Sequence, residues 1–501
     1  MKLGYLLQGV PIYDLIGDKE VDIQGLSYDS RRVQPGHLFV AIKGHEQDGH
    51  HYIQDALKRG AVALVAQEFE DFQDNVVRVK VPDSRDALSK MAVRFYENPC
   101  DDLCMIGITG TNGKTTTTYI LESIIAAAKG RPGIIGTVNS RFPGKVYPAA
   151  VTTPESLDLM CLLREMADNQ VTHVVMEVSS HAIDQGRTGD CAFNAAVFTN
   201  LSRDHLDYHQ TMDAYFQTKS RLFRGLGNGK DSPSFAVINW DDPKGKELAS
   251  LTQANVVTYG LDGEAHFRAE SIAMDRHGLT AKLITPVGER EVRSPLLGMV
   301  NIYNILAAAA TVISLGMDLH AVAEGVGSLK VVPGRLELVP NKRDLMVVVD
   351  YAHTPDALLK ALQTLRPITK GRLITVFGCG GDRDKGKRSE MGLAAGENSD
   401  VVIITSDNPR REDPASIVAR IEEGVRQTGL RKVEWAEDAK SLLSGYFIEV
   451  DRRKAIQNAL AMAHENDLVL IAGKGHEDYQ IIGTQKRHFD DREEVVAACG
   501  G

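Results

Sequence analysis

Short runs of apolar residues, separated by segments with helical spacing, follow one another along most of this chain of 501 residues. A strand inside a parallel sheet is apolar on both faces, and the helices between such strands cover the sheet. The pattern therefore predicts an α/β protein built on parallel sheets. The apolar runs lie at 38–42, 62–65, 105–108, 173–177, 195–198, 236–239, 346–349, 373–377, 401–404 and 468–471.

Length and changes in this pattern predict three domains. A chain of 501 residues is too long for one hydrophobic core and suggests domains of ~150 residues each. Residues 1–99 predict a small α/β domain, and residues 100–333 a central domain with a parallel sheet. Within the central domain, the alternating, glycine-punctuated stretch 260–295 predicts an antiparallel extension. After the turn sequence Val-Pro-Gly at 332–334, residues 334–501 predict a Rossmann-like domain.

A glycine-rich turn follows the apolar run at 105–108 and leads into a helical pattern. It reads Thr109-Gly110-Thr111-Asn112-Gly113-Lys114-Thr115-Thr116. Such a turn between a strand and a helix binds a triphosphate, because its N–H groups and its lysine contact the phosphates and its Thr hydroxyl ligates Mg²⁺. The helix dipole adds positive potential. The turn departs from the general GxxxxGK[ST] pattern, since Ile108 stands where the first glycine would be, and the alternative is a turn without a ligand.

Composition and charge narrow the class of protein. The net charge of −10 argues against a nucleic-acid partner, which would need clustered Lys and Arg. No basic and then apolar leader opens the chain, so we expect a cytoplasmic protein. The longest apolar stretch, 305–315, is too short to span a membrane. The six cysteines lack the spacing of a metal site and indicate reduced thiols.

Each of the four buried strands expected in the third region is followed closely by a polar loop. In open α/β sheets, ligands bind outside the carboxyl ends of the strands. Four such loops together predict a binding site at this edge. They read Asp350-Tyr351-Ala352-His353, Gly378-Cys379-Gly380-Gly381-Asp382-Arg383, Asp407-Asn408-Pro409-Arg410 and Gly473-Lys474-Gly475-His476-Glu477.

Together with the phosphate loop, these segments resemble the Mur ligase family, the ATP-dependent amide ligases that assemble the peptide of bacterial peptidoglycan. The resemblance covers nearly the whole chain and includes Glu177-Val178-Ser179-Ser180-His181, the segment 200–209, Gly298-x-x-Asn301-x-x-Asn304 and Pro333-Gly334-Arg335-Leu336-Glu337. Asp29-Ser30-Arg31 resembles the members that add the third amino acid to UDP-N-acetylmuramoyl-L-alanyl-D-glutamate. Asp407-Asn408-Pro409-Arg410 resembles the signature of those that take meso-diaminopimelate rather than lysine. A lysine-adding member and a folylpolyglutamate synthase-like ligase remain alternatives. A P-loop kinase and a nucleotide-gated binding module are rivals from other classes.

The resemblance implies ATP and Mg²⁺ as cofactors and a reaction through an acyl phosphate. The catalytic residues it implies are Lys114, Glu177, His205 and Lys219. The metal ligands it implies are Thr115, Glu177, His205 and Lys219, the lysine as a carbamate (N6-carboxylysine). Further nucleotide contacts would be Asn304, Arg335, Asp350 and His353. Contacts to the UDP-muramoyl dipeptide would be Tyr28, Ser30, His45, Glu46, Gln47, Thr152, Thr153, Ser179, Gln185 and Arg187. Without the resemblance, helical spacing alone predicts that Lys219 is exposed.

By the same resemblance, the residues that bind diaminopimelate would be Arg383, Asp407, Asn408, Pro409, Arg410, Gly473 and Glu477. Diaminopimelate differs from lysine by a second carboxylate, which a guanidinium binds bidentately. A lysine substrate would leave Arg410 facing an ammonium. Glu477 is the expected acceptor for the distal ammonium. We expect a monomer whose partners are small molecules, with no nucleic acid and no membrane span.

Overall fold

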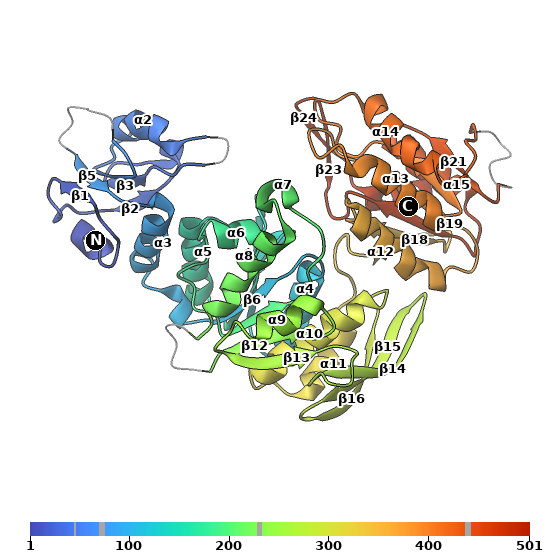
Figure 1. Ribbon diagram of the computed structural model, residues 1–501, viewed down its shortest axis with the longest axis horizontal. Coiled ribbons are helices and arrows are strands. Elements are labelled where there is room, and N and C mark those ends of the chain that lie inside the picture. The colour runs from blue at the N-terminus through green and yellow to red at the C-terminus, as the bar shows by residue number, and fades with distance from the viewer. Residues whose placement is uncertain (45–46, 70–75, 228–232, 436–441, 501) are drawn as a thin grey trace. The chain divides into compact units, whose positions relative to one another are not determined.

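The computed structural model describes residues 1–44, 47–69, 76–227, 233–435 and 442–500. Its helices and strands alternate along most of the chain (Figure 1). The chain divides into two compact units. The first comprises residues 1–110, 125–258 and 314–316, and the second comprises residues 111–124, 259–313 and 317–501.

The first unit begins with a five-stranded sheet of order β1-β5-β4-β3-β2, parallel except for β1. Phe39 and Leu64 pack on one face of this sheet with Ile53 and Ala56 of α2, which explains the apolar runs at 38–42 and 62–65. The elements are α1 (Leu3–Leu6), β1 (Asp14–Ile16), β2 (Gly25–Ser27), β3 (His37–Val40), α2 (Ile53–Lys58), β4 (Ala63–Ala66), β5 (Val77–Lys80) and α3 (Ser84–Phe95).

An eight-stranded sheet of order β13-β12-β11-β6-β10-β7-β8-β9 follows. Strand β6, which precedes the phosphate loop, runs parallel to both of its neighbours, so its carboxyl end lies at the edge where ligands bind in such sheets. Strands β8 and β9 add an antiparallel hairpin. The elements are β6 (Cys104–Thr109), α4 (Lys114–Ala127), β7 (Pro132–Ile135), β8 (Asn139–Phe142), β9 (Lys145–Pro148), α5 (Ser156–Asp168), β10 (His173–Glu177), α6 (Ser180–Asp184), β11 (Ala195–Phe198), α7 (Leu206–His209), α8 (Met212–Arg224), β12 (Phe235–Asn239), α9 (Pro243–Ala249) and β13 (Asn255–Tyr259).

The second unit contains a three-stranded antiparallel sheet, β14-β15-β16, beside α11. The antiparallel extension predicted at 260–295 is therefore confirmed. Buried and half-buried residues alternate along most of β15, as expected for a sheet with one solvated face. The elements are β14 (Arg268–Asp275), β15 (Gly278–Thr285), β16 (Gly288–Ser294), α10 (Val300–Ser314) and α11 (Leu319–Ser328).

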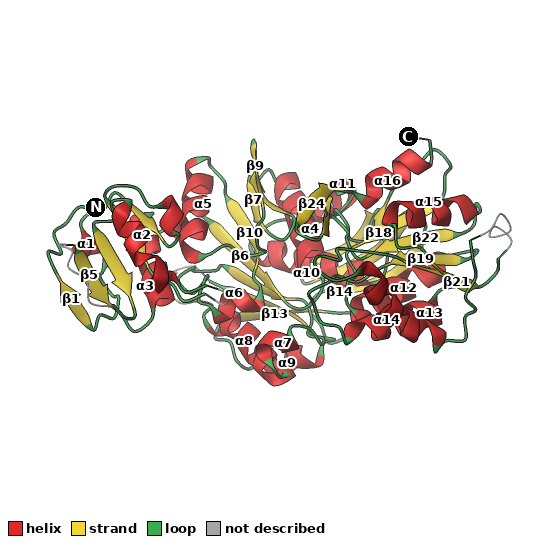
Figure 2. Ribbon diagram, turned by 90° about the horizontal axis from the view of Figure 1, so that it is seen from above, coloured by secondary structure: helices red, strands yellow, loops and turns green. Residues whose placement is uncertain are grey.

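The C-terminal sheet has the order β17-β18-β22-β19-β20-β21 and is parallel except for β17. Helices α12, α13 and α14 cover one face, and α15 and α16 cover the other (Figure 2). The elements are β17 (Glu337–Leu338), β18 (Met346–Asp350), α12 (Pro355–Leu365), β19 (Leu373–Phe377), α13 (Lys387–Asn398), β20 (Val401–Ile404), α14 (Pro414–Arg426), β21 (Gly445–Ile448), α15 (Arg452–Met462), β22 (Leu468–Ala472), β23 (Tyr479–Ile482), β24 (Gln485–His488) and α16 (Asp491–Ala498).

The α/β class with parallel sheets is confirmed, while the domain bounds at 99 and 333 stay a prediction. The four strands that precede the polar loops, β18, β22, β19 and β20, are consecutive neighbours in one sheet. Strand β21 and the β23–β24 hairpin were not predicted, because the apolar run in β21 is only three residues long and those in the hairpin are shorter still. Within the described ranges, the structure has no helix with the length and apolar character needed to cross a membrane.

Candidate functional site

The turn after β6 has a backbone conformation that favours glycine. The φ angles of Gly110 and Gly113 are 142° and 87°. A Cβ atom on Gly110 would lie only 1.9 Å from the hydroxyl oxygen of Thr199. Helix α4 begins directly after the turn at Lys114, whose Nζ donates to the carbonyl of Thr111 at 2.8 Å. The ammonium is therefore folded back over the turn, as expected for a lysine that contacts phosphates.

The side chain of Asn304, on α10, is held beside this turn. Its Nδ2 donates to the side-chain oxygen of Asn301 at 2.8 Å, and its Oδ1 accepts from the Thr117 hydroxyl at 3.3 Å. A Cβ on Gly113 would lie 2.5 Å from the same Oδ1. The expected nucleotide contact Asn304 thus lies against the start of α4.

Arg335 also reaches α4. Its Nη2 donates to the Thr115 hydroxyl at 3.3 Å, and its guanidinium carbon lies 4.7 Å from the ring centroid of Tyr351. The Nε of Arg335 is buried and has no hydrogen-bond partner in the part of the chain that the structure describes. Because leaving a buried donor unsatisfied is costly, this guanidinium suits an anionic oxygen supplied by a bound phosphate.

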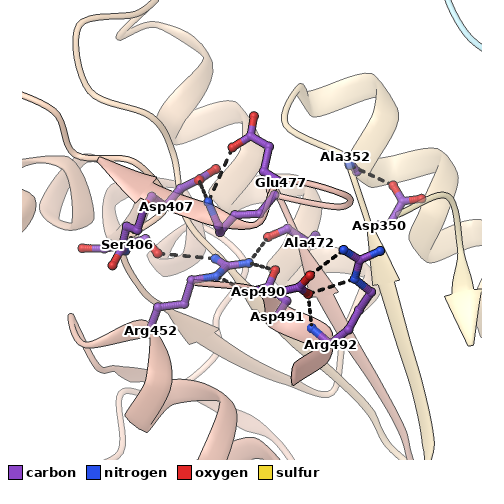
Figure 3. Close-up of polar contacts among 12 residues, drawn as sticks. Asp350, Ala352, Ser406, Asp407, Arg452, Ala472, Glu477, Asp490, Asp491 and Arg492 are labelled. Atoms are coloured by element: carbon purple, nitrogen blue, oxygen red, sulfur yellow. Dashed lines mark hydrogen bonds and ion pairs between the residues drawn. The ribbon is translucent and has the colours of Figure 1, made fainter. Parts of the chain in front are cut away.

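Asp350 positions the segment that carries Arg335. It is the last residue of β18, and its carboxylate accepts the N–H groups of Leu336 at 2.7 Å and of Ala352 at 2.8 Å; Figure 3 shows the second of these bonds. Burial raises the pKa of Asp350. The carboxylate therefore ties the loop after β18 to the backbone beside Arg335.

Aromatic rings gather around Tyr351. The ring centroids of His353 and His476 lie 4.6 Å and 5.1 Å from that of Tyr351. Burial, followed by the charge of Arg335, lowers the pKa of His476 to about 4, and burial raises the pKa of Tyr351 to about 12. Tyr351 and His476 are therefore uncharged near pH 7, and the cluster can stack against a base.

Glu177 is the last residue of β10 and is 1% exposed. Its two carboxylate oxygens accept from the backbone N–H and the hydroxyl of Thr137 at 2.9 and 3.0 Å. The Thr137 hydroxyl lies 3.1 Å from that of Thr152. Thr153 donates to the Glu177 carbonyl at 2.8 Å and accepts the N–H of Ser179 at 3.1 Å. The structure therefore brings Glu177 together with Thr152, Thr153 and Ser179.

Arg187 lies against the same threonines. Its guanidinium donates to the Thr153 carbonyl at 2.9 Å and to the Gln185 side chain at 2.7 and 3.1 Å. Glu155 lies 3.7 Å from its Nε and also pairs with Arg85 at 2.5 Å. Gln185 and Arg187 are thus held in place by one polar network. Sequence reasoning missed Arg85 and Glu155.

Lys219, on α8, is only 2% exposed. Its Nζ donates to the carbonyl of Gly110 at 3.0 Å and lies 3.5 Å from the Thr109 hydroxyl. The ammonium also lies 4.5 Å from the ring centroid of Tyr215. The exposure that helical spacing predicts for Lys219 is therefore wrong, because α8 packs this residue against the end of β6.

His205 lies at the start of α7 with a φ angle of 53°, and its side chain is 44% exposed. Its Nε2 is 3.4 Å from Asp204, and its ring centroid is 4.9 Å from that of His181. Burial lowers the pKa of His181. Across the described segments of the chain, no three His, Cys, Asp or Glu side chains form a metal-binding group. Mg²⁺ commonly combines one or two carboxylates with phosphates and waters.

Three of the residues in the N-terminal region that are expected to contact the UDP-muramoyl dipeptide, Tyr28, Ser30 and Gln47, lie in described parts of the chain. The Tyr28 hydroxyl donates to the carboxylate of Asp158, and the burial of the phenol and this bond both raise the pKa of Tyr28. Ser30 is buried, and Gln47 accepts a hydrogen bond from a tyrosine hydroxyl at 3.4 Å. Two further expected contacts, His45 and Glu46, lie outside the described residues.

The loops after β20 and β22 are joined by side chains. The amide nitrogen of Asn408 donates to Glu477 at 2.9 Å, and its amide oxygen accepts the N–H of Ile481 at 2.9 Å. A Cβ on Gly473, whose φ angle is 114°, would lie 2.8 Å from a carboxylate oxygen of Asp407. The structure therefore brings four of the expected amino-acid contacts together, namely Asp407, Asn408, Gly473 and Glu477.

Arg410 connects the loop after β20 to the loop after β19. It has a φ angle of 51°, and its Nη1 donates to the carbonyl of Gly381 at 2.8 Å. A Cβ on Gly381 would lie 1.8 Å from the Pro409 carbonyl, so these two loops are in close contact. Arg383 is exposed and donates to the carbonyl of Asp382 at 3.4 Å.

Comparison with known proteins finds relatives that are similar to this chain over nearly its whole length. A protein of Geobacter metallireducens named UDP-N-acetylmuramoyl-L-alanyl-D-glutamate–2,6-diaminopimelate ligase is 49% identical over 489 residues, which cover 96% of this chain and 95% of the relative. A relative of the same name from Geobacter sulfurreducens is 46% identical and covers 99% of this chain and 98% of its own. The chain belongs to the Mur ligase family.

Three profiles of the Mur ligase family match successive parts of the chain. The profile described as the Mur ligase family catalytic domain matches residues 22–96, the middle domain residues 108–312, and the glutamate ligase domain residues 334–475. A solved structure titled as a UDP-N-acetylmuramoyl-L-alanyl-D-glutamate–2,6-diaminopimelate ligase is 33% identical, with a TM-score of 0.68, and covers 100% of this chain and 99% of its own. The resemblance to Mur ligases is confirmed.

Three charged residues buried beside the loops of this Mur ligase were not among the expected site residues. Lys474 is 0% exposed, and Arg388 and Arg452 are each 1% exposed. Arg452 forms a fully buried ion pair with Asp491 at 2.7 Å (Figure 3). The sequence could have identified Lys474 as a site residue, because it stands between two glycines directly after a buried strand. The two arginines occur in polar helical starts, which are usually solvated.

One of these arginines supports a pH-dependent prediction. The Arg388 guanidinium donates to both oxygens of Glu412 at 3.0 and 2.9 Å, and Glu412 also accepts the N–H of Asp382 at 2.7 Å. These bonds lower the pKa of Glu412 from 4.5 to about 2. The ionised carboxylate therefore stabilises the fold fully above pH ~4.5, and this contribution is lost as the pH falls through about 2.

We expect Glu412→Gln to lower the thermal midpoint at pH 7 by at least about 2 °C, because it leaves the buried guanidinium of Arg388 without its counter-charge. The difference from the parent protein should shrink below pH ~4.5 and vanish near pH 2. Scanning calorimetry over a pH series measures it. Exposed Glu423→Gln, on the neighbouring α14, is the control and should change nothing. A deficit that persists at pH 2 would contradict the prediction.

Proposed function

We propose that this protein is an ATP-dependent amide ligase that joins meso-diaminopimelate to UDP-N-acetylmuramoyl-L-alanyl-D-glutamate, in peptidoglycan precursor synthesis. The observation that carries the proposal is the similarity of the chain, over nearly its whole length, to relatives that are named for this activity. The joined loops after β19, β20 and β22 support it, because they bring together carboxylates and a guanidinium that suit a zwitterionic amino acid.

The first step transfers the γ-phosphoryl group of ATP to the D-glutamate carboxylate and gives an acyl phosphate and ADP. This transfer needs positioning and charge neutralisation more than covalent help from the protein. Gly110, Gly113 and Lys114 provide the phosphate cradle. Arg335, with its buried Nε, contributes a second cation for the phosphates. Asn304 and the rings around Tyr351 hold the nucleoside.

Mg²⁺ is a hard cation that prefers oxygen ligands. The Thr115 hydroxyl and the Glu177 carboxylate are such donors, and His205 and Lys219, the latter as a carbamate, complete the expected set. When bound, Mg²⁺ would neutralise charge that develops on the transferred phosphoryl group. Glu177 has two oxygens already fixed by Thr137, so its orientation is set before any ion arrives.

In the second step, the amine of diaminopimelate attacks the acyl carbon, an amide bond forms and phosphate leaves. Arg410 holds the distal carboxylate and Glu477 the distal ammonium. Because Arg410 and Glu477 bind the carboxylate and the ammonium of the same distal stereocentre, only one configuration of that centre places both groups correctly. Arg187, Thr152, Thr153 and Ser179 bind the muramoyl dipeptide. We propose that the enzyme acts in the cytoplasm as a monomer.

An amino-acid panel tests this function directly. The purified protein is supplied with ATP, Mg²⁺ and UDP-N-acetylmuramoyl-L-alanyl-D-glutamate, and each of meso-diaminopimelate, L-lysine and L-glutamate in turn. We expect one new amide product, detected by mass spectrometry, with meso-diaminopimelate at least about 100-fold more efficient than lysine, a difference of about 2.7 kcal/mol. Equal or better use of lysine would indicate the lysine-adding alternative. ATP consumption without a new amide would indicate a kinase.

A further inference from the structure

The buried amino group of Lys474 lies between the two carboxylates of the expected amino-acid site. Its Nζ is 3.5 Å from Glu477 Oε2 and 3.9 Å from Asp407 Oδ1; Figure 3 labels the two acidic residues. The Nζ also donates to the carbonyl of Tyr479. The lysine is 0% exposed, so it contacts the site from the protein side.

The backbone conformation on both sides of Lys474 favours glycine and allows the lysine to lie close to the two carboxylates. Glycines with positive φ angles stand on both sides of it, 114° at Gly473 and 53° at Gly475. A Cβ on Gly473 would lie 2.8 Å from Asp407 Oδ2, and one on Gly475 would lie 2.6 Å from Tyr351. A larger residue at either position would therefore push the lysine away from its carboxylates.

A count of charges shows what remains for a ligand. Asp407 and Glu477 carry two negative charges, and Lys474 supplies one positive charge. The neighbouring Arg452 is neutralised by Asp491, since both side chains are fully buried and their charged atoms lie 2.7 Å apart. The cluster is therefore left with one net negative charge, which an ammonium group from a substrate would balance.

We propose that Lys474 is a positioning residue for the amino-acid substrate: its ammonium, which lies between the carboxylates of Glu477 and Asp407, holds them in place so that Glu477 binds the substrate ammonium. This inference rests on the proposed function. Burial and the neighbouring Asp407 raise the pKa of Glu477, while Lys474 opposes that rise. Two carboxylates without a cation between them would share a proton, and the protonated one would lose its attraction for an ammonium.

The hydrogen bonds around this lysine show why the effect should be confined to one substrate. Asn408 donates to the same Glu477 oxygen at 2.9 Å, and the carbonyl of Asp407 accepts from Gln480 at 2.7 Å. These bonds hold the loops together without Lys474. Removing its charge should therefore change the electrostatics of the carboxylates more than the path of the loops.

Two variants and two measurements test the proposal. Lys474→Met removes the charge at similar length, and Lys474→Gln also removes it but retains a donor for the Tyr479 carbonyl. Steady-state kinetics give KM for diaminopimelate, ATP and the UDP-muramoyl dipeptide. Positional isotope exchange in labelled ATP, with the dipeptide but without diaminopimelate, reports reversible acyl phosphate formation alone. Lys454→Met, an exposed lysine on α15, is the matched control.

We expect both variants to raise KM for diaminopimelate at least about tenfold, with KM for ATP within about twofold and isotope exchange within about threefold of the parent protein. An unchanged KM for diaminopimelate overturns the proposal. So does a parallel loss of exchange and amide formation, or failure of both variants to fold, because each indicates a purely structural lysine. If the parent protein itself forms no amide with diaminopimelate, the proposed function fails, and this inference fails with it.

Discussion

Replacing Arg410 by alanine is expected to reduce kcat/KM for diaminopimelate by about 30-fold to several thousand-fold. This range corresponds to the roughly 2–5 kcal/mol measured when one partner of a desolvated charge pair is truncated. We propose that the Arg410 guanidinium is the cation that binds the distal carboxylate of diaminopimelate. Its Nη1 contact with the Gly381 carbonyl uses only one of its five donors, so the fork retains hydrogen-bonding capacity. Use of lysine, which lacks that carboxylate, should fall much less.

The neighbouring arginine provides the control for this variant. Arg411 is exposed, and its backbone N–H, rather than its guanidinium, donates to Asp382. Arg411→Ala should therefore leave kcat/KM for diaminopimelate within about twofold of the parent value. Kinetics with diaminopimelate and lysine in parallel measure both variants. An unchanged KM and kcat in Arg410→Ala would show that this guanidinium does not contact the substrate.

Lys219→Ala is expected to lose at least about 100- to 1,000-fold in kcat while it retains the fold, the range for removing one preorganised charged group from a polar active site. The Nζ of Lys219 contacts the Gly110 carbonyl at 3.0 Å, at the first glycine of the phosphate loop. If the lysine acts as a carbamate, added formate or acetate should restore part of the activity. Circular dichroism checks the fold, and ATP-dependent amide formation measures the loss and rescue.

A second lysine with similar surroundings serves as the control. The Nζ of Lys244 lies 4.5 Å from the ring centroid of Phe216, the same distance that separates Lys219 from the centroid of Tyr215. Lys244 also pairs with Glu247 at 2.6 Å and is partly exposed. Lys244→Ala should keep nearly full activity, because the Lys244 ammonium lies against Phe216 and Glu247 rather than against Gly110. Full turnover in Lys219→Ala would remove the carbamate proposal.

The phosphate loop could be predicted from the sequence because its chemistry is local. Gly110, Gly113 and Lys114 lie within five positions, and the strand and helix on either side follow directly from the apolar pattern. Backbone conformation and side-chain type are then both set by neighbours in the chain. The same holds for the polar loops after β18, β19, β20 and β22, which parallel strands must bring to one edge.

Contacts between distant segments could not be predicted in this way. The link from Arg335 to Thr115 spans 220 positions, and the link from Asn408 to Glu477 spans 69. No local pattern encodes which loop meets which, since that depends on the order of strands in the sheet. The local pattern identified Thr115 and the loops that carry Asn408 and Glu477, whereas the specific roles of Arg335, Asn408 and Glu477 came from the resemblance to Mur ligases.

The sequence by itself determined the α/β class, the phosphate loop and the loops at the carboxyl ends of the C-terminal strands, because each follows from periodicity and short motifs. Only the tertiary structure decided that Lys219 is buried against Gly110 and that Lys474 lies between Asp407 and Glu477. Lysine is usually solvated, so a helical or loop pattern places it in water. Its burial depends on the oxygen atoms that other segments bring to it, and these are set by packing across the whole fold.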